Sequence, residues 1–196
     1  MPLTVPNTAP FSGVQKMWLK GYLDGLNCAL APVFGANSTQ SAAPPATAGL
    51  PVTILWGSQT GNSEALGKRL SKTLAANGHS PTLRDMAEVS LHDLSVSTTV
   101  LIITSTYGDG EPPDNAAALH AALLATDAPQ LASVRFAVLA LGDSNYPDFC
   151  KCGHDFHDRL TALGAKPLIP IIESDVDYDV PFANWIARLK SALVAA

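Results

Sequence analysis

One segment, Val52–Leu66, limits what this chain can fold into more strongly than any other. It begins with the apolar run Val52–Trp56, which is typical of a buried strand, and passes into a loop of hydroxyl and amide side chains. The loop leads into a predicted helix that begins at Asn62 or Ser63 and ends near Ala76. Apolar residues recur along this helix close to the helical period, at Ala65, Leu66, Leu70 and Leu74. The segment therefore predicts a strand, a loop and a helix in direct succession.

The loop Ser58–Ser63 is predicted to bind a phosphate. A helix N-terminus offers unpaired backbone N–H groups and the positive end of the helix dipole. Side-chain donors gather at the same point, at Ser58, Thr60, Asn62 and Ser63. The loop has no Gly-Lys-Ser/Thr ending and no Gly-x-Gly-x-x-Gly pattern, so it is neither a P-loop nor a dinucleotide loop. Its donors are neutral, and the alternative reading is an ordinary helix N-cap.

The rest of the chain alternates strands and helices, which predicts an α/β fold with a parallel sheet and helices on both faces. Pro170 has no N–H for a ladder, so we expect the last strand at an edge. A final helix is predicted from Pro181 to Val194. The five strands are predicted at Val52–Trp56, Pro81–Asp85, Thr99–Thr104, Val134–Leu141 and Leu168–Ile172. We therefore expect a five-stranded, doubly wound sheet whose ligand lies beyond the carboxyl ends of the strands.

The loops after the third and fourth strands each carry one tyrosine among small polar residues. Tyr107 lies between Ser105-Thr106 and Gly108-Asp109-Gly110, and Tyr146 follows Gly142-Asp143-Ser144-Asn145. Glycine allows the backbone to approach a flat ligand closely, and a tyrosine ring offers a stacking face. Together with the phosphate loop, these residues predict a ligand that is a flat aromatic heterocycle bearing one phosphate.

Three motifs give the chain its resemblance to a known family. Ser-Gln-Thr-Gly-Asn at 58–62, Ser-Thr-Tyr-Gly-Asp-Gly-Glu-Pro-Pro-Asp-Asn at 105–115 and Leu-Gly-Asp-Ser-Asn-Tyr at 141–146 resemble the FMN loops of the diflavin reductases. Phe149-Cys150 and Ser174-Asp175-Val176-Asp177-Tyr178 resemble the sulfite reductase flavoprotein (alpha) subunits more than the cytochrome P450 reductases. The resemblance implies a flavodoxin-like domain that binds FMN.

The resemblance also implies the residues that contact FMN, with no catalytic residue and no metal ligand among them. One departure is Tyr107, where some sulfite reductase subunits carry a glutamine. The implied phosphate contacts are Ser58, Gln59, Thr60, Gly61, Asn62 and Ser63. The implied ring contacts are Ser105, Thr106, Tyr107, Gly108, Asp109, Gly110, Leu141, Gly142, Asp143, Ser144, Asn145, Tyr146, Phe149, Cys150 and Asp175.

Acidic residues surround the predicted site, with no Lys or Arg in its loops before Lys151. They are Asp109, Glu111, Asp114, Asp143, Asp148, Glu173, Asp175, Asp177 and Asp179. Negative charge disfavours a reduced, anionic flavin and attracts a basic acceptor. The alternative hypothesis is an acidic face that is simply solvated. Cys150 lies near a predicted helix start, where the pKa of a thiol is expected to fall. His154 and His157 are expected to be solvated or capping residues.

The first fifty residues differ from the rest of the chain. Residues 1–30 form a leader with a predicted amphipathic helix at Val14–Leu30, either a docking helix for a partner subunit or a helix packed on its own domain. Residues 31–50 are a linker rich in Pro, Ala, Ser and Thr without charge, and residues 51–196 form the FMN domain.

Composition limits the classes of partner that we expect this chain to bind. A formal charge of −5 over 196 residues argues against nucleic acid, and no run of about 18 apolar residues predicts a membrane span. The three cysteines form no disulfide pattern, which fits a reducing cytoplasm.

We expect a one-electron carrier, an electron-transfer domain and not a complete enzyme. Its donor would be an FAD- and NADPH-binding reductase module, and its acceptor a haem or sirohaem protein. The alternatives are a free-standing flavodoxin, an NAD(P)H–quinone oxidoreductase of the same fold and a flavin-free interaction module.

Overall fold

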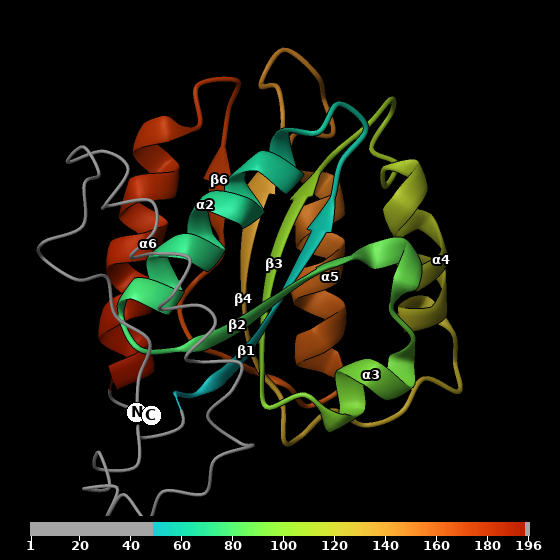
Figure 1. Cartoon of the computed structure of the whole chain (residues 1–196). Coiled ribbons are helices and arrows are strands. Elements are labelled where there is room, and N and C mark those ends of the chain that lie inside the picture. The colour runs from blue at the N-terminus through green and yellow to red at the C-terminus, as the bar shows by residue number, and fades with distance from the viewer. Residues whose placement is uncertain (1–48, 195–196) are drawn as a thin grey trace, which may run out of the picture. The chain divides into compact units, whose positions relative to one another are not determined.

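The computed structural model describes residues 49–194, which form a parallel sheet covered by helices on both faces (Figure 1). The strands lie in the order β2-β1-β3-β4-β5, and β6 also pairs with β4. Strand bounds are β1 Pro51–Gly57, β2 Ser80–Asp85, β3 Thr99–Ser105, β4 Arg135–Leu141, β5 Lys166–Pro167 and β6 Ile172–Ser174. Helix bounds are α2 Asn62–Ala76, the 3-10 turn η1 Met86–Glu88, α3 Leu91–Val96, α4 Asp114–Leu124, α5 Lys151–Ala162 and α6 Asp179–Val194.

This architecture confirms the predicted α/β class, the parallel sheet and the positions of the first four strands. The first four strands and α2 agree with their predicted bounds to within one residue at each end. The reason is physical, because β-branched and apolar runs such as β3 are stable only when both faces of the strand are covered. The predicted leader helix at Val14–Leu30 and nearly all of the linker 31–50 lie outside the described residues.

The prediction of one continuous fifth strand at Leu168–Ile172 is wrong. The edge of the sheet instead holds two short strands, β5 and β6, which both pair with β4. Between them lies Pro170, which has no N–H to donate to the ladder. The pairing of β5 with Arg135 and Phe136 therefore stops, and pairing resumes only at Ile172 beside Leu139.

Two apolar cores lie on opposite faces of the sheet because alternate side chains of each strand point to opposite sides. On one face, Ile54 and Ile103 pack with α2 and α6, and on the other, Leu55 and Ile102 pack with α4 and α5. Figure 1 shows the same division, with α2 and α6 on one side and α4 and α5 on the other. Neighbouring strands are thus held rigidly along their length, and their ends become fixed points for loops.

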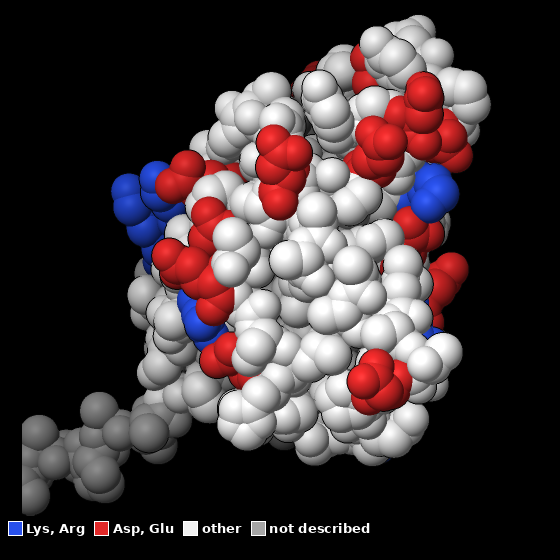
Figure 2. Space-filling model, turned by 90° about the vertical axis from the view of Figure 1, so that its right-hand side faces the viewer, with Lys and Arg blue, Asp and Glu red and all other residues white. Residues whose placement is uncertain are grey.

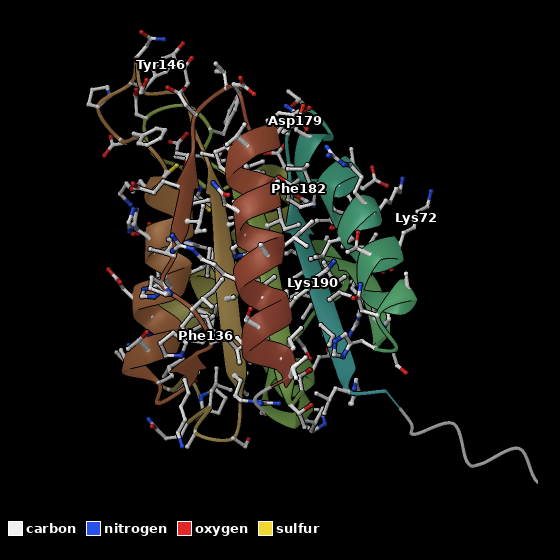
Figure 3. All side chains as sticks on the ribbon, turned by 90° about the vertical axis from the view of Figure 1, so that its left-hand side faces the viewer. Lys72, Phe136, Tyr146, Asp179, Phe182 and Lys190 are labelled. Atoms are coloured by element: carbon white, nitrogen blue, oxygen red, sulfur yellow. The ribbon has the colours of Figure 1, made fainter. Side chains whose placement is uncertain are left out.

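The last helix begins two residues earlier than predicted, at Asp179 instead of Pro181. Its predicted inward side chains Phe182, Trp185, Leu189 and Leu193 are buried, while Ile186 is half-buried. The Asp179 carboxylate accepts a hydrogen bond of 2.9 Å from Arg69 of α2, whose guanidinium also lies 4.9 Å from the Phe182 ring centre. Figure 3 shows Asp179 and Phe182 near the upper end of α6, beside α2.

The strand order reverses between β1 and β3, which connect to helices on opposite faces. At such a switch point the loops after adjacent strands diverge and leave room for a ligand at the carboxyl edge of the sheet. The loops that follow β1, β3 and β4 all leave this edge (Figure 1). The fold therefore brings together the three segments on which the sequence prediction rests.

Candidate functional site

The β1–α2 loop is organised around the Ser58 hydroxyl. Its Oγ accepts hydrogen bonds from the backbone N–H of Gly61 at 2.9 Å and of Ser63 at 3.4 Å. Gly61 has a φ of 87°, a left-handed conformation that strains other residues, and a Cβ added there would meet nothing within 4 Å. The loop is thus tightly turned around its own hydroxyl, with open space beside Gly61.

Donor groups of this loop remain available to an anion. Within residues 49–194, the backbone N–H groups of Thr60 and Asn62 have no protein acceptor. Both precede or begin α2, where the helix dipole favours negative charge. The buried Ser63 hydroxyl also has no hydrogen-bond partner in this part of the chain. The arrangement suits a phosphate bound by neutral donors.

The start of α4 holds the β1–α2 loop from the side. Asn115 accepts a hydrogen bond of 2.9 Å from the Ser58 N–H and donates to the Trp56 carbonyl at 3.2 Å. The Gln59 amide donates to the Asp114 carboxylate at 3.1 Å and accepts from the Asp114 N–H at 3.3 Å. The Gln59 side chain is therefore held by Asp114, with one of its two N–H donors and its oxygen engaged.

A cavity of about 490 Å³ opens beside this loop at the carboxyl edge of the sheet. The side chains of Tyr107 and Tyr146, 52% and 59% exposed, both line it. Tyr146 lies at the outer tip of its loop in Figure 3. The lining residues are Asn62, Ser105, Thr106, Tyr107, Gly108, Leu141, Gly142, Asp143, Tyr146, Asp148, Phe149, Asp175, Val176 and Tyr178.

The β3–α4 loop presents Tyr107 through a small hairpin. The Tyr107 and Glu111 backbones exchange two hydrogen bonds of 2.8 Å, and the turn between them uses positive φ values of 52° at Gly108 and 96° at Gly110. These backbone angles explain why glycine stands at both positions, since a side chain at either one would strain the turn. The hairpin fixes the backbone of Tyr107 while leaving half of its side chain in solvent.

The β4–α5 loop is tied to the segment after β6. The Gly142 N–H donates to the Ser174 carbonyl at 2.9 Å, and the Asp175 carboxylate accepts from the backbone N–H and the hydroxyl of Ser144. The hydroxyl bond is the main cause that lowers the pKa of Asp175, helped by the N–H groups of Val176 and Ser144. Two loops far apart in the sequence thus form one wall of the cavity.

The predicted low pKa for Cys150 is wrong. Burial raises the pKa of this thiol to about 11, and that of the buried Cys152 thiol also to about 11. Cys150 precedes α5 with a φ of 57°, and its Sγ lies 3.2 Å from the Ala140 carbonyl and outside the cavity lining. The apolar surroundings of Cys150 outweigh its place at a helix start.

The structure brings most of the predicted ring contacts to the cavity, but not all of them. Asp109, Gly110, Ser144, Asn145 and Cys150 lie in the loops without lining it. Asp148, Val176 and Tyr178 also line the cavity, although they were not among the predicted contacts, and the bracing of the loop by Asn115 was not predicted either. The signal for the first three was their position in the tyrosine loop and in the stretch Ser174–Tyr178.

The charge around the cavity is negative. Asp143, Asp148 and Asp175 line it, and among its lining residues in the described part of the chain none is basic. Lys151, the first basic residue after the loops, pairs through its ammonium with Asp155 at 2.6 Å, and this hydrogen bond raises the pKa of Lys151. Figure 2 shows several acidic side chains toward the loop end of one face, with basic side chains at its edges.

Within residues 49–194, no group of three His, Cys, Asp or Glu side chains is arranged to hold a metal ion, and no helix has the length and apolarity to cross a membrane. His154 lies 2.6 Å from Glu173, and His157 lies 3.1 Å from Asp158.

Loop and cavity together fit a flat ligand that ends in a phosphate. Asn62 belongs both to the loop and to the cavity lining, which it shares with the two half-exposed tyrosines. The other predicted phosphate contacts lie in the loop beside the cavity without lining it: Ser58, Gln59, Thr60, Gly61 and Ser63. FMN has this shape and this single phosphate. The donor set is neutral, as the sequence predicted.

Comparison with known proteins agrees with this geometry. The family described as Flavodoxin matches residues 54–185. The sulfite reductase [NADPH] flavoprotein alpha-component of Shewanella sp. (strain MR-4) is 43% identical over 192 residues, covering 95% of this chain and 30% of the relative. That of Bacillus subtilis (strain 168) is 41% identical over 181 residues, covering 91% and 30%. The chain therefore spans about 30% of the length of these relatives.

Solved structures share the fold. A cysteine-to-alanine mutant of flavodoxin from Pseudomonas aeruginosa superposes with a TM-score of 0.64 and 30% identity, covering 74% of this chain and 99% of that one. A flavodoxin from Streptococcus pneumonia TIGR4 gives a TM-score of 0.66 at 23% identity, covering 74% and 99%. The second likeness shows the fold alone.

Proposed function

This chain belongs to the flavodoxin family, and from that premise we propose that residues 51–196 are the electron-transfer domain of a sulfite reductase-type flavoprotein. FMN is the cofactor of the domain, and when bound it can hold one or two electrons and pass them on one at a time. The observation that carries the proposal is the cavity with a phosphate loop at one end and two half-exposed tyrosines at the other. Such a site holds a flavin firmly while leaving one edge open to a partner.

In this proposal the chain's own residues divide the work. The backbone N–H groups of Thr60 and Asn62 and the hydroxyls of the loop hold the phosphate. Tyr107 and Tyr146 cover the two faces of the ring and exclude part of the water. No positioned acid or base is required for passing an electron, which is why no catalytic residue is assigned.

The acidic lining adjusts how readily the site gives up electrons. Carboxylates at Asp143, Asp148 and Asp175 oppose the gain of negative charge inside the cavity. The reduced site is therefore a stronger donor than one lined with Lys or Arg. The same carboxylates form a rim to which a basic surface is attracted.

We propose a haem or sirohaem protein as acceptor and an FAD- and NADPH-binding module as donor. The support is the relatives' name and their length, of which this chain spans about 30%. The leader 1–30 and the linker 31–50 are proposed to tether or dock the domain. A reducing cytoplasm is proposed as its compartment, and the free thiols of Cys150 and Cys152 are consistent with it.

Rapid mixing of the anaerobically reduced FMN-loaded chain with oxidised cytochrome c, a basic haem protein, tests the proposal. We expect single-electron transfer whose rate falls as ionic strength rises, because opposite charges steer the encounter. The double variant D143N/D148N should be slower and less dependent on salt. The matched variant D127N/D158N removes the same charge away from the cavity and should behave like the wild type.

Three results would contradict parts of the proposal. A chain that does not bind FMN would contradict the assignment of the cofactor. Equal slowing of both double variants would contradict the assignment of the acidic rim as the docking surface. Reduction of the bound flavin by NADPH alone, without a reductase module, would favour a quinone oxidoreductase instead.

A further inference from the structure

We infer that Asn115 is a positioning residue that sets the phosphate loop in its binding conformation before any ligand arrives. The inference rests on the proposed placement of the FMN phosphate at Ser58–Ser63. Asn115 does not line the cavity, so its action on the ligand passes through the loop.

The Asn115 side chain makes three hydrogen bonds, which engage its oxygen and both of its N–H donors. Its Oδ1 accepts from the Ser58 N–H at 2.9 Å, and its Nδ2 donates to the Trp56 carbonyl at 3.2 Å and to the Asp85 carboxylate at 2.8 Å. An asparagine amide offers one acceptor oxygen and two N–H donors. Each of these partners matches one of those groups, so the amide is locked in a single orientation.

The three bonds connect segments that are distant in the sequence. Ser58 and Trp56 lie 57 and 59 positions from Asn115 and belong to the end of β1 and its loop, while Asp85 ends β2, 30 positions away. Asn115 itself lies in the first turn of α4, shortly after the hairpin that presents Tyr107. The amide is therefore a common fixed point for the phosphate loop, the β2 end and the ring loop.

Asp114 adds a second connection between the same two segments. It exchanges two hydrogen bonds with the Gln59 side chain, at 3.1 and 3.3 Å. This pair is exposed, so water competes with it, whereas the Asn115 bonds are partly buried. We expect Asn115 to carry most of the effect.

Bracing by Asn115 matters for binding because an ordered loop loses less conformational entropy when a ligand arrives. The Ser58 N–H is held by Asn115, and the Ser58 hydroxyl in turn holds the N–H groups of Gly61 and Ser63. Without the amide, Ser58 loses its anchor and the donors that follow lose their common direction. The loss should fall on a ligand that carries a phosphate and spare one that does not.

The test compares FMN with riboflavin, which has the same ring and no phosphate, on the full chain without bound flavin. For Asn115→Ala we expect the Kd of FMN to rise at least tenfold, while the Kd of riboflavin changes less than twofold. Amide hydrogen exchange at Ser58 should be at least tenfold faster in the flavin-free variant. Asn77→Ala is the matched control, because that amide donates to the Thr73 carbonyl at the far end of α2.

A swap variant covers the case in which Asn115→Ala does not fold. D85N/N115D keeps an amide facing a carboxylate and an acceptor for the Ser58 N–H, and it conserves the net charge. We expect it to recover part of the FMN affinity, whereas Asn115→Asp alone sets two carboxylates against each other and should bind FMN worse than the swap.

The outcomes distinguish the positioning role of Asn115 from the proposed placement of the FMN phosphate. A wild-type chain that binds FMN no more tightly than riboflavin would overturn the phosphate placement itself. A wild type that prefers FMN, with an Asn115→Ala variant that weakens both ligands equally or neither, would overturn the positioning role. Unchanged exchange at Ser58 would overturn it as well.

Discussion

The two ends of the cavity are built in opposite ways. At the phosphate end, a short loop is fixed between a buried strand and a long helix, and its hydrogen bonds converge on Ser58 and Asn115. At the ring end, three separate loops contribute, and Tyr107 and Tyr146 keep 52% and 59% of their surface in solvent. The phosphate loop offers neutral donors, and the rest of the cavity is lined with the carboxylates of Asp143, Asp148 and Asp175.

The difference indicates how a flavin site reconciles tight binding with electron exchange. In the proposed placement of FMN, a preformed phosphate loop would supply affinity at a distance from the ring, so the ring end would not have to enclose the ligand. The ring end is then free to remain exposed and charged. Each end should therefore respond to its own class of substitutions, and comparison of FMN with riboflavin separates them.

The largest effect is expected at the phosphate end, from Asn62→Asp. A carboxylate about 5 Å from a phosphate charge, at an effective dielectric of about 20, costs roughly 3 kcal/mol per pair of charges. We expect the Kd of FMN to rise about 100-fold or more, with the Kd of riboflavin nearly unchanged. The flavin-free protein should instead gain about 0.3–1 kcal/mol of stability, because an acid at a helix N-terminus interacts well with the dipole.

Titration calorimetry and thermal unfolding of the flavin-free chain measure the two opposite changes. Asn77→Asp is the control, since it makes the same substitution at the other end of α2 and should leave the Kd of FMN within twofold. Equal weakening of FMN and riboflavin by Asn62→Asp would mean that the two ends are not separate.

A smaller effect is expected at the ring end, from Tyr146→Ala. An aromatic stack contributes roughly 0.5–1.5 kcal/mol, so the Kd of FMN and that of riboflavin should rise together by up to about tenfold. Tyr146→Phe keeps the stacking face and should bind both ligands nearly as the wild type does. Flavin fluorescence titrations measure all four constants. A loss confined to FMN would contradict the assignment of Tyr146 to the ring.

The smallest effect concerns the wall that joins Ser144 to Asp175. Hydrogen bonds to the carboxylate lower the pKa of Asp175 in the folded chain. Their contribution to the stability of the folded state is therefore fully present above the ordinary carboxyl pKa, and it is lost as pH falls through the lowered pKa. Ser144→Ala removes the main cause and should move this pKa back toward its ordinary value. At neutral pH both flavins should bind no more than about threefold more weakly.

Carbon-detected NMR titration of the Asp175 carboxyl checks the direction of that shift. Ser95→Ala serves as its control, because that hydroxyl donates to the His92 carbonyl and lies in α3, away from the cavity. An Asp175 titration that is identical in the wild type and in Ser144→Ala would show that the hydroxyl does not set the pKa.

Much of the fold was predictable because its signals are local. The run Val52–Trp56 and the spacing of Leu66, Leu70 and Leu74 determine β1 and α2 wherever these elements pack. The interruption at the sheet edge was harder to predict, because Pro170 removes one donor, and whether a strand survives that loss depends on its neighbour β4.

The candidate site was predictable only where its residues follow a strand directly. Tyr107 and Tyr146 were found from their loops, and both line the cavity. Val176 and Tyr178 were not found from the sequence. They follow β6, and only the pairing of β6 with β4 brings them to the cavity. Cys150 shows the same limit, since its place before a helix predicted a lower pKa and burial raises it.

The sequence by itself determined the order of strands and helices, the neutral donors at Ser58–Ser63 and the two tyrosine loops. These depend on periodicity and on residues within a few positions of each other, which act through local backbone conformation. Only the tertiary structure decided that Asn115 braces Ser58, that Asp175 holds Ser144 and that Cys150 is buried. Those contacts join positions 31 to 57 residues apart or depend on burial, and no local pattern encodes which distant groups the fold brings together.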